Sequence, residues 1–531
     1  MIEVRGIAAE ASKKGDFTLK VFQAANAAGV PIPQFAAEIA AEALENPLVL
    51  TATAVGGFVN VTLDPSAMFS TYLSSDPDGW DDYQGHVLVE FSSPNSNKPL
   101  HLGHLRNICL GDSISRILSN AGYRVRKINL VNDRGVHICK AMLMWDGEEP
   151  EEKGDQFVGQ LYAAFCKLEA DDPTQTERAR DLLKLWEAGD EDTLQKWREM
   201  RAIVLEGHDA TYARLGVDFY REEYESDSWT IGRDAVLDPK NAEYIRRDAD
   251  GSVWWDTEDV TKLVVRSDGT TVYMTQDIGT VIYRASDPYK PDSILYVVGC
   301  EQDLHFRQLT SIMGALEPSV ELEHVSYGMI SLPEGRLKSR EGRTVDVDDL
   351  LDEMLDMERK AAAASEHWKD IGDEDLEIIA QGAVKFFLLR FSPRTEFTFD
   401  PDESIRLTGD TGPYVQYMAR RAKSILDSLP ETDGEFADPK VWSLTEADKP
   451  LLRVLFKSLS LYAHAAAARS PAIVCSYLLE LSREFSRWYE FNHVLVEDDH
   501  LRITRSALVY EVYSILEEGL SNLGILVPSK M

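Results

Sequence analysis

The sequence predicts an α/β protein in three parts: a small α+β domain, a parallel sheet covered by helices, and an all-α helical bundle. Three observations carry this prediction. Strand and helix patterns mix in the first 80 residues, a strand–helix–strand unit follows, and strand patterns fade beyond about residue 400. A chain of 531 residues is long enough for two to four domains at roughly 150 residues each.

Residues 1–80 are expected to form the α+β domain. PQFAAEIAAEALE has helical spacing, and VGGFVNVTL alternates apolar and polar residues as a half-buried strand does. The segment ends in DPDGWDDYQG, whose Asp, Gly and Pro content is typical of a linker.

Residues 81–400 are expected to hold the parallel sheet. HVLVEF has the length of a strand, and SSPNSNKP is rich in turn residues. A helix follows, with Gly122 at its C-cap, and RVRKINLV is a second strand. Strand, helix and strand in this order favour a parallel sheet. One face of the helix is apolar: Leu110, Ile114, Ile117, Leu118 and Ala121.

The charged, helix-compatible stretch from about 145 to 250 is interpreted as an insertion, and KLVVRS, TVYMT and SILYVVG predict that the sheet resumes after it. Residues 401–531 are expected to form the helical bundle. Its helices are predicted in ARRAKSIL, LLRVLFKSLSLYAHAAAA and AIVCSYLLELSREFSRWYEF. Leu478, Leu481, Phe485 and Trp488 lie on one face of the last segment.

Composition excludes several classes. No apolar run approaches the roughly 20 residues of a membrane span, and the start MIEVRGIAAEASKK lacks an apolar signal core, so we expect a cytoplasmic protein without a membrane partner. The five cysteines are scattered without a CxxC pair, which predicts reduced, mostly buried thiols. A formal charge of -35 argues against a general polyanion binder. Residues 411–531, however, are nearly balanced in charge.

The stretch FSSPNSNKPLHLGHLRN, residues 91–107, carries the first chemical signal. Pro94 and Pro99 keep the loop extended, and Gly103 at the start of a helix lets a ligand approach the backbone closely. The helix N-terminus favours phosphate, to which His101 and His104 can donate hydrogen bonds. A pair of incidental surface histidines is the alternative.

A second signal lies in GMISLPEGRLKSREGRTV, residues 328–345. This basic loop, punctuated by glycines, can close over the negative charge of a triphosphate. On its own, a basic loop is more often solvated surface.

Together the two elements resemble the HIGH and KMSKS motifs of class I aminoacyl-tRNA synthetases. The wider sequence is similar to the arginyl-tRNA synthetase family. This similarity covers nearly the whole chain and is weakest over residues 145–250. The matching blocks are VEFSSPNSNKPLHLGHLRN, INLVNDRGVHICKAMLMW, RSDGTTVYMTQDIG, YVVGCEQDLHF, HVSYGMISLPEGRLKSREGRTV and LGILVPSKM.

The resemblance implies activation of L-arginine by ATP to arginyl-adenylate and transfer to tRNA(Arg), on a Rossmann-like catalytic domain. Mg²⁺ arrives with ATP, and no metal-ligand spacing is found among the histidines. Residues 1–80 would contact the tRNA elbow and residues 401–531 the anticodon. We expect a monomer.

The resemblance also assigns the ATP site. Lys98, His101, His104 and Lys338 are the implied catalytic residues. The loop departs from KMSKS at Ser339, where the second lysine is expected, and Lys98 just before the HIGH motif is the candidate for the missing charge. The implied ATP-binding residues are Ser93, Pro94, His101, Gly103, His104, Met329, Arg336, Lys338, Ser339 and Arg340.

A pocket for arginine needs carboxylates around a planar guanidinium with five donors. Glu90 and Asp277 match the family's guanidinium ligands, Tyr273 packs on the side chain, and Asn95 and Gln302 hold the amino-acid end. Taken alone, Glu90 is more often an ordinary carboxylate at a strand end.

Four further residues, Asn132, Asp133, His137 and His305, receive no definite role. Many relatives have glutamine where His137 stands, so either a substrate contact or a structural histidine is open there.

Basic and aromatic residues in SREFSRWYEFNH are suited to stacking on unpaired bases. Trp488 in the core with solvated arginines is the alternative. The predicted tRNA-binding residues are Phe58, Asn60, Arg483, Arg487, Trp488, Tyr489 and Met531. Two other functions stay open: a catalytically silent RNA-binding paralogue, and a small-molecule nucleotidylyltransferase that shares the HxGH pattern.

Overall fold

A computed structural model of the chain describes residues 3–5, 7–11, 15–75, 83–316, 319–331, 333, 345–364, 371–429 and 442–531. It divides into two compact units. Unit 1 comprises Met1–Pro77, Arg421–Ser460 and Leu479–Leu516. Unit 2 comprises Asp78–Arg420, Leu461–Leu478 and Glu517–Met531.

Unit 1 contains a five-stranded antiparallel sheet in the order β1-β2-β3-β5-β4. Helix α2 packs against β4 and β5 and contacts α1. Asp64 caps α3 by accepting a hydrogen bond from the Ala67 N–H at 2.7 Å. A buried ion pair between Lys449 and Asp16, 3.1 Å long, joins the sheet to α16. The bounds are β1 Glu3–Val4, β2 Ile7–Ala11, β3 Phe17–Lys20, α1 Phe22–Ala28, α2 Ile32–Ala43, β4 Val49–Val55, β5 Phe58–Leu63, α3 Pro65–Ser74 and α16 Lys449–Ser458.

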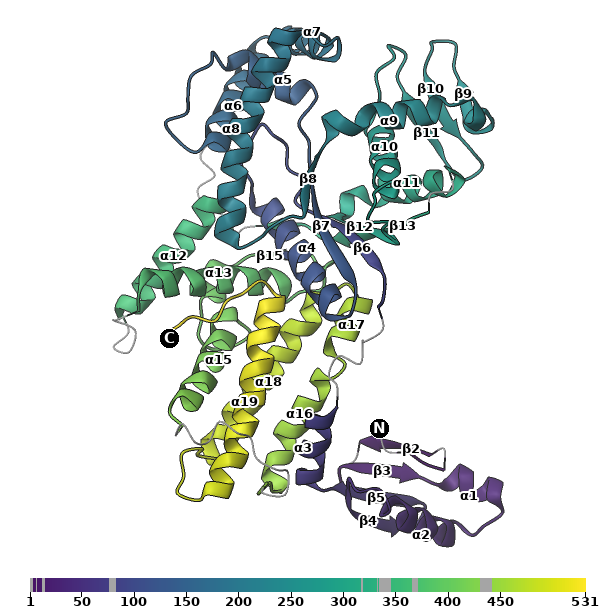
Figure 1. Cartoon of the computed structure of the whole chain (residues 1–531), viewed down its shortest axis with the longest axis vertical. Coiled ribbons are helices and arrows are strands. Elements are labelled where there is room, and N and C mark those ends of the chain that lie inside the picture. The colour runs from purple at the N-terminus through teal and green to yellow at the C-terminus, as the bar shows by residue number, and fades with distance from the viewer. Residues whose placement is uncertain are drawn as a thin grey trace. The chain divides into compact units, whose positions relative to one another are not determined.

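Unit 2 is built on a five-stranded parallel sheet in the order β13-β12-β6-β7-β8 (Figure 1). From β6 the chain adds β7 and β8 on one side, and later β12 and β13 on the other. Ligands of such sheets bind outside the carboxyl ends of the strands where the order reverses, here between β6 and β12. The strands are β6 His86–Glu90, β7 Arg124–Val131, β8 Arg221–Tyr224, β12 Ser293–Gly299 and β13 Glu321–Tyr327.

Helix α4, Leu102–Asn120, links β6 to β7 as the sequence predicts. Its apolar face is fully buried, and Gly122 adopts a left-handed φ of 84° just after the helix, which a side chain would disfavour. The predicted strand–helix–strand unit is therefore confirmed, and it places residues 91–101 at the carboxyl edge of the sheet.

The stretch from 145 to 250 contains a helical layer between β7 and β8, but the main sheet already resumes at β8. Trp186 and Trp197 pack edge to face in its core, with ring centroids 5.3 Å apart. The helices are α5 Val136–Met144, α6 Gly154–Asp171, α7 Gln175–Glu187 and α8 Glu191–Leu215.

The predicted return of the sheet is wrong for two of its three segments. KLVV forms β11, Thr261–Val265, in a separate antiparallel sheet with β10, Val253–Asp256, and β9, Ile245–Arg247. YMT begins helix α10, Tyr273–Ala285, because Met274, Ile278 and Val281 repeat at helical spacing and bury one face. SILYVVG alone joins the parallel sheet, as β12.

The remaining elements of unit 2 before residue 405 follow β8 in the chain, and β14 pairs with β15 in a two-stranded sheet of its own. Two lie between β8 and β12: α9 Glu225–Leu237 and η1 Pro239–Tyr244. The others follow β12: η2 Cys300–Gln302, α11 Asp303–Leu316, β14 Ile330–Ser331, α12 Val347–Ala364, α13 Asp373–Leu389, β15 Phe397–Thr398 and α14 Pro401–Ser404.

The C-terminal region is helical, as predicted, although LLRVLFKSLSLYAHAAAA forms two helices, α16 and α17, Leu461–Ala467. Leu478, Leu481, Phe485 and Trp488 are all buried. Three further helices each contribute residues to both units: α15 Gly412–Asp427, α18 Pro471–Phe491 and α19 Asp499–Asn522.

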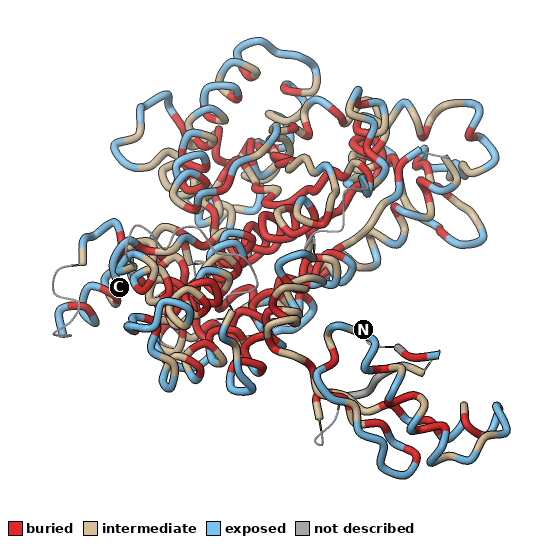
Figure 2. Tube along the Cα trace, turned by 60° about the horizontal axis from the view of Figure 1, so that its bottom comes forward, coloured by how far each residue is buried: buried red, intermediate tan, exposed pale blue. Residues whose placement is uncertain are grey.

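Figure 2 shows buried residues running through the helices and strands, with exposed residues in the connecting loops. Over the part of the chain that the structure describes, no helix is both long and apolar enough to span a membrane. Cys109, Cys139 and Cys475 are buried free thiols, and Cys166 and Cys300 are partly buried free thiols.

Candidate active site

The turn after β6 is held in a conformation that side chains rarely adopt. Ser92 and Ser93 have positive φ angles of 71° and 46°. The Ser92 N–H donates to Asn107 Oδ1 at 2.5 Å, and Ser92 Oγ lies 2.6 Å from the Tyr212 hydroxyl. This strain, sustained by α4 and α8, directs the chain toward the N-terminus of α4.

The two histidines of the HxGH stretch form the cap of α4. His101 Nδ1 accepts a hydrogen bond from the Gly103 N–H at 3.2 Å, and His104 Nδ1 accepts one from the His101 N–H at 3.1 Å. Because each Nδ1 is an acceptor, the proton of each neutral ring lies on Nε2. Each imidazole thus retains an N–H donor for a ligand.

Burial keeps both rings neutral. It lowers the pKa of His101 to about 4, with a further contribution from the charge of Lys98. The pKa of His104 lies well below its ordinary value because of burial, then His101 and Lys98. The ring centroids are 3.9 Å apart. At neutral pH the pair therefore offers two uncharged donors.

Lys98 supplies a positive charge beside these donors. Its side chain is half-buried, and burial lowers the pKa of its ammonium. His208 Nε2 lies 3.0 Å from the Lys98 carbonyl oxygen. Among the residues that the structure describes, no carboxylate forms an ion pair with Lys98. Its charge is available to a phosphate.

Arg336, Lys338, Ser339 and Arg340 of the basic loop lie outside the described residues, but both flanks of the loop are described. Arg106, fully buried in α4, donates to the carbonyl oxygens of Gly328 at 2.6 Å and Pro393 at 2.8 Å. On the other flank, the Leu102 N–H donates to the Val345 oxygen at 3.1 Å, and the Val347 N–H donates to the Leu100 oxygen at 3.0 Å. The loop thus leaves and rejoins the fold at α4. Met329 is half exposed on its first flank.

Carboxylates gather at the same edge of the sheet. Glu90 ends β6 and pairs with the buried Arg284 at 2.5 Å, so one of its oxygens is already engaged. Asp277 Oδ2 lies 2.5 Å from His305 Nε2. Glu225, the first residue of α9, is 7% exposed. Burial, and then the charges of Asp277 and Asp133, raise the pKa of Glu225 to about 8. These neighbouring acids make the edge favourable for a bound cation.

Glu225 is a residue that the sequence did not reveal. It follows strand β8 within REEYES, where neighbouring acids hide it. Its only sequence signal is its place directly after a strand of the sheet, and that strand was not predicted.

The other predicted arginine-binding residues lie around this edge. Tyr273 is 62% exposed at the start of α10, one helical turn before Asp277, so the two share a face. Asn95 forms a parallel bridge with Asn132 next to the strained turn. Gln302 is exposed in η2, which directly follows β12.

The unassigned residues receive structural positions. Asn132 Nδ2 donates to the Ser93 oxygen at 3.1 Å. Asp133 is buried and accepts from Arg201 at 2.7 Å and from the Ser226 hydroxyl at 2.8 Å, which joins the end of β7 to α9. His305 holds Asp277, and His137 is exposed.

Among the predicted tRNA-binding residues, Trp488 is in the core. It is 4% exposed, and its indole N–H donates to Asp448 at 2.8 Å, which favours the structural alternative for this residue. Arg483 and Arg487 are exposed, and Tyr489 is partly buried with Arg421 over its ring at 4.7 Å.

The N-terminal and C-terminal candidates differ in exposure. Phe58 is 40% exposed with its ring edge to face against Phe22, and Asn60 accepts from the Thr18 hydroxyl at 2.7 Å. Met531 packs against a small cluster that contains Leu376.

Across the described residues, no group of three or more His, Cys, Asp or Glu side chains is arranged to hold a metal ion.

A parallel sheet with an HxGH-capped helix at its switch point is the catalytic arrangement of class I aminoacyl-tRNA synthetases. The model of tRNA synthetases class I (R), catalytic domain, matches residues 76–400, and that of the DALR anticodon binding domain matches residues 415–531. The chain belongs to the arginyl-tRNA synthetase family.

Individual relatives agree. An arginine–tRNA ligase of Porphyromonas gingivalis is 38% identical over 98% of this chain and 94% of its own length, and one of Treponema denticola is 38% identical over 96% and 91%. The structure of Thermus thermophilus arginyl-tRNA synthetase matches with a TM-score of 0.78 and 27% identity, over 99% of this chain and 96% of that one. The α/β fold class with a helical C-terminal domain is thereby confirmed.

Proposed function

We propose that the chain activates L-arginine with ATP and transfers the arginyl group to tRNA(Arg), with the residues above in defined roles. The observation that carries these roles is the pairing of two opposite chemistries at one sheet edge. Neutral imidazole donors cap α4 with Lys98 just before them, and a cluster of carboxyl groups that includes Glu225 lies at the same sheet edge.

The α4 end of this edge fits a triphosphate. The Nε2–H groups of His101 and His104 donate to phosphate oxygens, and Lys98 offsets the charge that develops on the leaving pyrophosphate. The helix N-terminus adds a favourable dipole, and Gly103 leaves room for close approach. Mg²⁺ would enter with ATP as part of that substrate and would offset part of the charge of its phosphates.

The carboxylate cluster fits a guanidinium. Among the described residues, Asp277 contacts His305 and forms no ion pair with a lysine or arginine, and Glu90 is shared with Arg284. Glu225 is protonated at neutral pH in the free protein and can ionise beside a bound cation. Arginine would place its side chain against Tyr273 and its charge among these acids. Asn95 and Gln302 are proposed to hold its amino group and carboxylate.

The reaction proceeds by positioning and charge stabilisation. An oxygen of the arginine carboxylate attacks the α-phosphorus of ATP, the bond to the bridging oxygen of the β-phosphate breaks, and pyrophosphate leaves. A ribose hydroxyl of the terminal tRNA nucleotide then attacks the carbonyl carbon of the adenylate. The hydroxyl loses its proton, the acyl–phosphate bond breaks, and AMP leaves.

For tRNA, we propose that exposed Arg483 and Arg487 contribute to the anticodon contact and that Phe58 contributes to the elbow contact. The match to a DALR anticodon binding domain supports the first assignment. A small-molecule nucleotidylyltransferase has no use for such a domain. A silent paralogue would not need Lys98, His101 and His104 together.

The test is exchange of labelled pyrophosphate into ATP with each amino acid, with and without tRNA. We expect arginine alone to support exchange, and we expect the signal to be nearly absent until tRNA is added, as the family resemblance implies. Better exchange with lysine, glutamate or cysteine would contradict the assignment. Exchange with no amino acid, at any tRNA concentration, would favour the silent paralogue.

A further inference from the structure

Unit 2 has a second pocket, of about 700 Å³, at the amino ends of the parallel strands. His86, Arg124 and Arg221 are the first residues of β6, β7 and β8 and all line it. The rise of about 3.3 Å per residue puts roughly 13 Å between the ends of β6 alone. This amino-edge pocket is therefore separate from the α4 site.

The cations of the amino-edge pocket outnumber its acids. Three arginines line it, Arg124, Arg126 and Arg221, with one carboxylate, Asp287. Arg221 pairs with Asp287 and with Glu223. Within the described residues, no carboxylate forms an ion pair with Arg124 or Arg126. Asp287 interacts electrostatically with Arg126 as well as with Arg221, so the pocket still carries more positive than negative charge, which favours an anion even in a chain of net charge -35.

Arg126 is held ready for an oxyanion. Its guanidinium carbon lies 4.0 Å from the ring centroid of Tyr220 and 3.8 Å from that of Tyr289. Stacking uses the faces of the guanidinium and leaves its in-plane N–H donors, whose fork matches a phosphate. His86 stacks on Tyr289 with centroids 4.4 Å apart, which fixes that ring.

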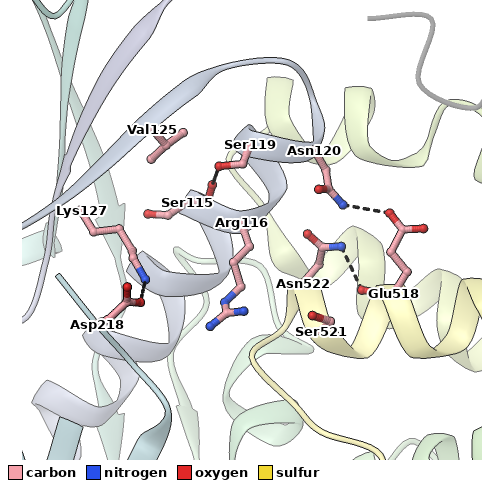
Figure 3. A pocket seen from close by; sticks show the side chains of 10 residues that line it. All are labelled: Ser115, Arg116, Ser119, Asn120, Val125, Lys127, Asp218, Glu518, Ser521 and Asn522. Atoms are coloured by element: carbon pink, nitrogen blue, oxygen red, sulfur yellow. Dashed lines mark hydrogen bonds and ion pairs between the residues drawn. The ribbon is translucent and has the colours of Figure 1, made fainter. Parts of the chain in front are cut away.

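The opposite face of β7 offers a contrast. Side chains alternate along a strand, so Val125 and Lys127 line a different pocket, of about 410 Å³, between α4, β7 and α19 (Figure 3). There Lys127 pairs with Asp112 at 3.1 Å and with Asp218, and Arg116 pairs with Asp112 at 2.8 Å. Every cation of that pocket is neutralised, so it offers no comparable anion site.

We propose that the amino-edge pocket binds a phosphate group, with Arg126 as the bidentate donor and Arg124 as a second charge. The phosphate comes either from the backbone of an RNA or from a free anion such as inorganic phosphate or pyrophosphate. The site needs neither the α4 residues nor the carboxylate cluster, so it stands even if the proposed catalytic roles fail.

The test compares the full-length protein with the double variant Arg124→Gln/Arg126→Gln. Calorimetric titrations with inorganic phosphate and pyrophosphate measure the free-anion arm. A tRNA transcript, titrated between 50 and 200 mM salt, measures the RNA arm. Arg116→Gln is the matched control because its cation is already paired. Arg124→Gln alone and Arg126→Lys serve as milder variants, since Arg124 is exposed and lysine keeps the charge.

A loss of about 1.5 in the slope of log affinity against log salt for tRNA supports the pocket with RNA as the source. At least tenfold weaker binding of inorganic phosphate or pyrophosphate, with an unchanged slope, supports it with a free anion as the source. Arg126→Lys should weaken binding by several fold, because an ammonium lacks the fork. If neither probe distinguishes the double variant from Arg116→Gln, the proposal is overturned.

Discussion

The two edges of the parallel sheet in unit 2 carry opposite chemistry. At the carboxyl edge, Glu90 and Glu225 are buried, and the imidazoles of His101 and His104 are neutral. At the amino edge, Arg124 and Arg126 line an open pocket with tyrosines. The comparison shows that the burial of an ionisable group affects its interactions as much as the sign of its charge does, because desolvation strengthens each electrostatic interaction at the carboxyl edge. Substitutions there should have the larger effects.

Removing the charge of Lys98 at the carboxyl edge should have the largest effect on the rate of arginine activation. Lys98→Met removes a preorganised cation from the phosphate site, which by analogy with lost oxyanion donors costs about 2.7 to 4 kcal/mol. We expect the rate of tRNA-supported pyrophosphate exchange to fall on the order of 100-fold or more, with little change in arginine binding.

Lys184→Met, on the exposed face of α7, is the matched control and should leave exchange within about twofold, as surface substitutions do. Near-normal exchange in Lys98→Met would transfer the role to Lys338 or Arg340 of the basic loop.

The next largest effect should come from Asp277→Asn. Loss of a carboxylate that faces the guanidinium costs about 2 to 5 kcal/mol by comparison with truncated buried ion pairs, so the Michaelis constant for arginine should rise more than about 10-fold. That for ATP should change by only a few fold. Equal effects on both substrates would mean that Asp277 supports the site as a whole.

Glu90→Gln is a less direct probe of the same pocket. It removes a partner of the fully buried Arg284, whose second partner is Glu223 at 2.8 Å. Breaking a buried pair from one side destabilises by about 3 to 5 kcal/mol. We therefore expect a lower melting temperature together with weaker arginine binding, whereas Asp277→Asn should melt near the wild type.

A moderate effect is expected from pH. The pKa of Glu225 is raised from 4.5 to about 8 in the folded protein, so its carboxyl is protonated at neutral pH without ligand. A bound guanidinium favours the ionised form, and arginine binding should then release a proton. Affinity should rise with pH up to about 8, by at most about tenfold per unit, and level off above it.

Calorimetry at pH 7 in buffers of different ionisation enthalpy measures this proton. Glu225→Gln should abolish both the release and the pH dependence. The same shift implies that the free protein loses stability as pH rises from about 5 through 8, because the unfolded carboxyl has already ionised. Arginine binding that is independent of pH in this window would contradict the assignment of Glu225.

The smallest effect is expected for the pH dependence of kcat, to which the capping histidines His101 and His104 should contribute nothing near neutral pH. Burial lowers the pKa of His101 to about 4 and that of His104 well below its ordinary value, so neither ring changes charge between pH 6 and 8. At saturating arginine, kcat should show no ionisation near 6.5. An ionisation that disappears in His101→Asn would mean that this imidazole carries a proton during the reaction.

Local signals in the sequence were enough to predict several elements. The HxGH stretch, the helix after it and the strand RVRKINLV each follow from spacing, capping and turn residues within a few positions. The resemblance then assigned Glu90, Lys98, Asp277 and the two histidines to one site, and the fold places them around the carboxyl ends of β6 and β12.

Other features depend on residues that are distant in the sequence, and they could not be predicted before the fold was known. KLVV pairs in a second sheet, Trp488 is buried, and Glu225 becomes part of the carboxylate cluster because elements far apart in sequence pack together. The partner of Glu90 is likewise Arg284, from α10. A local pattern specifies which face of an element is apolar, but burial and charge pairing are properties of the assembled core, where desolvation sets the protonation state of each group.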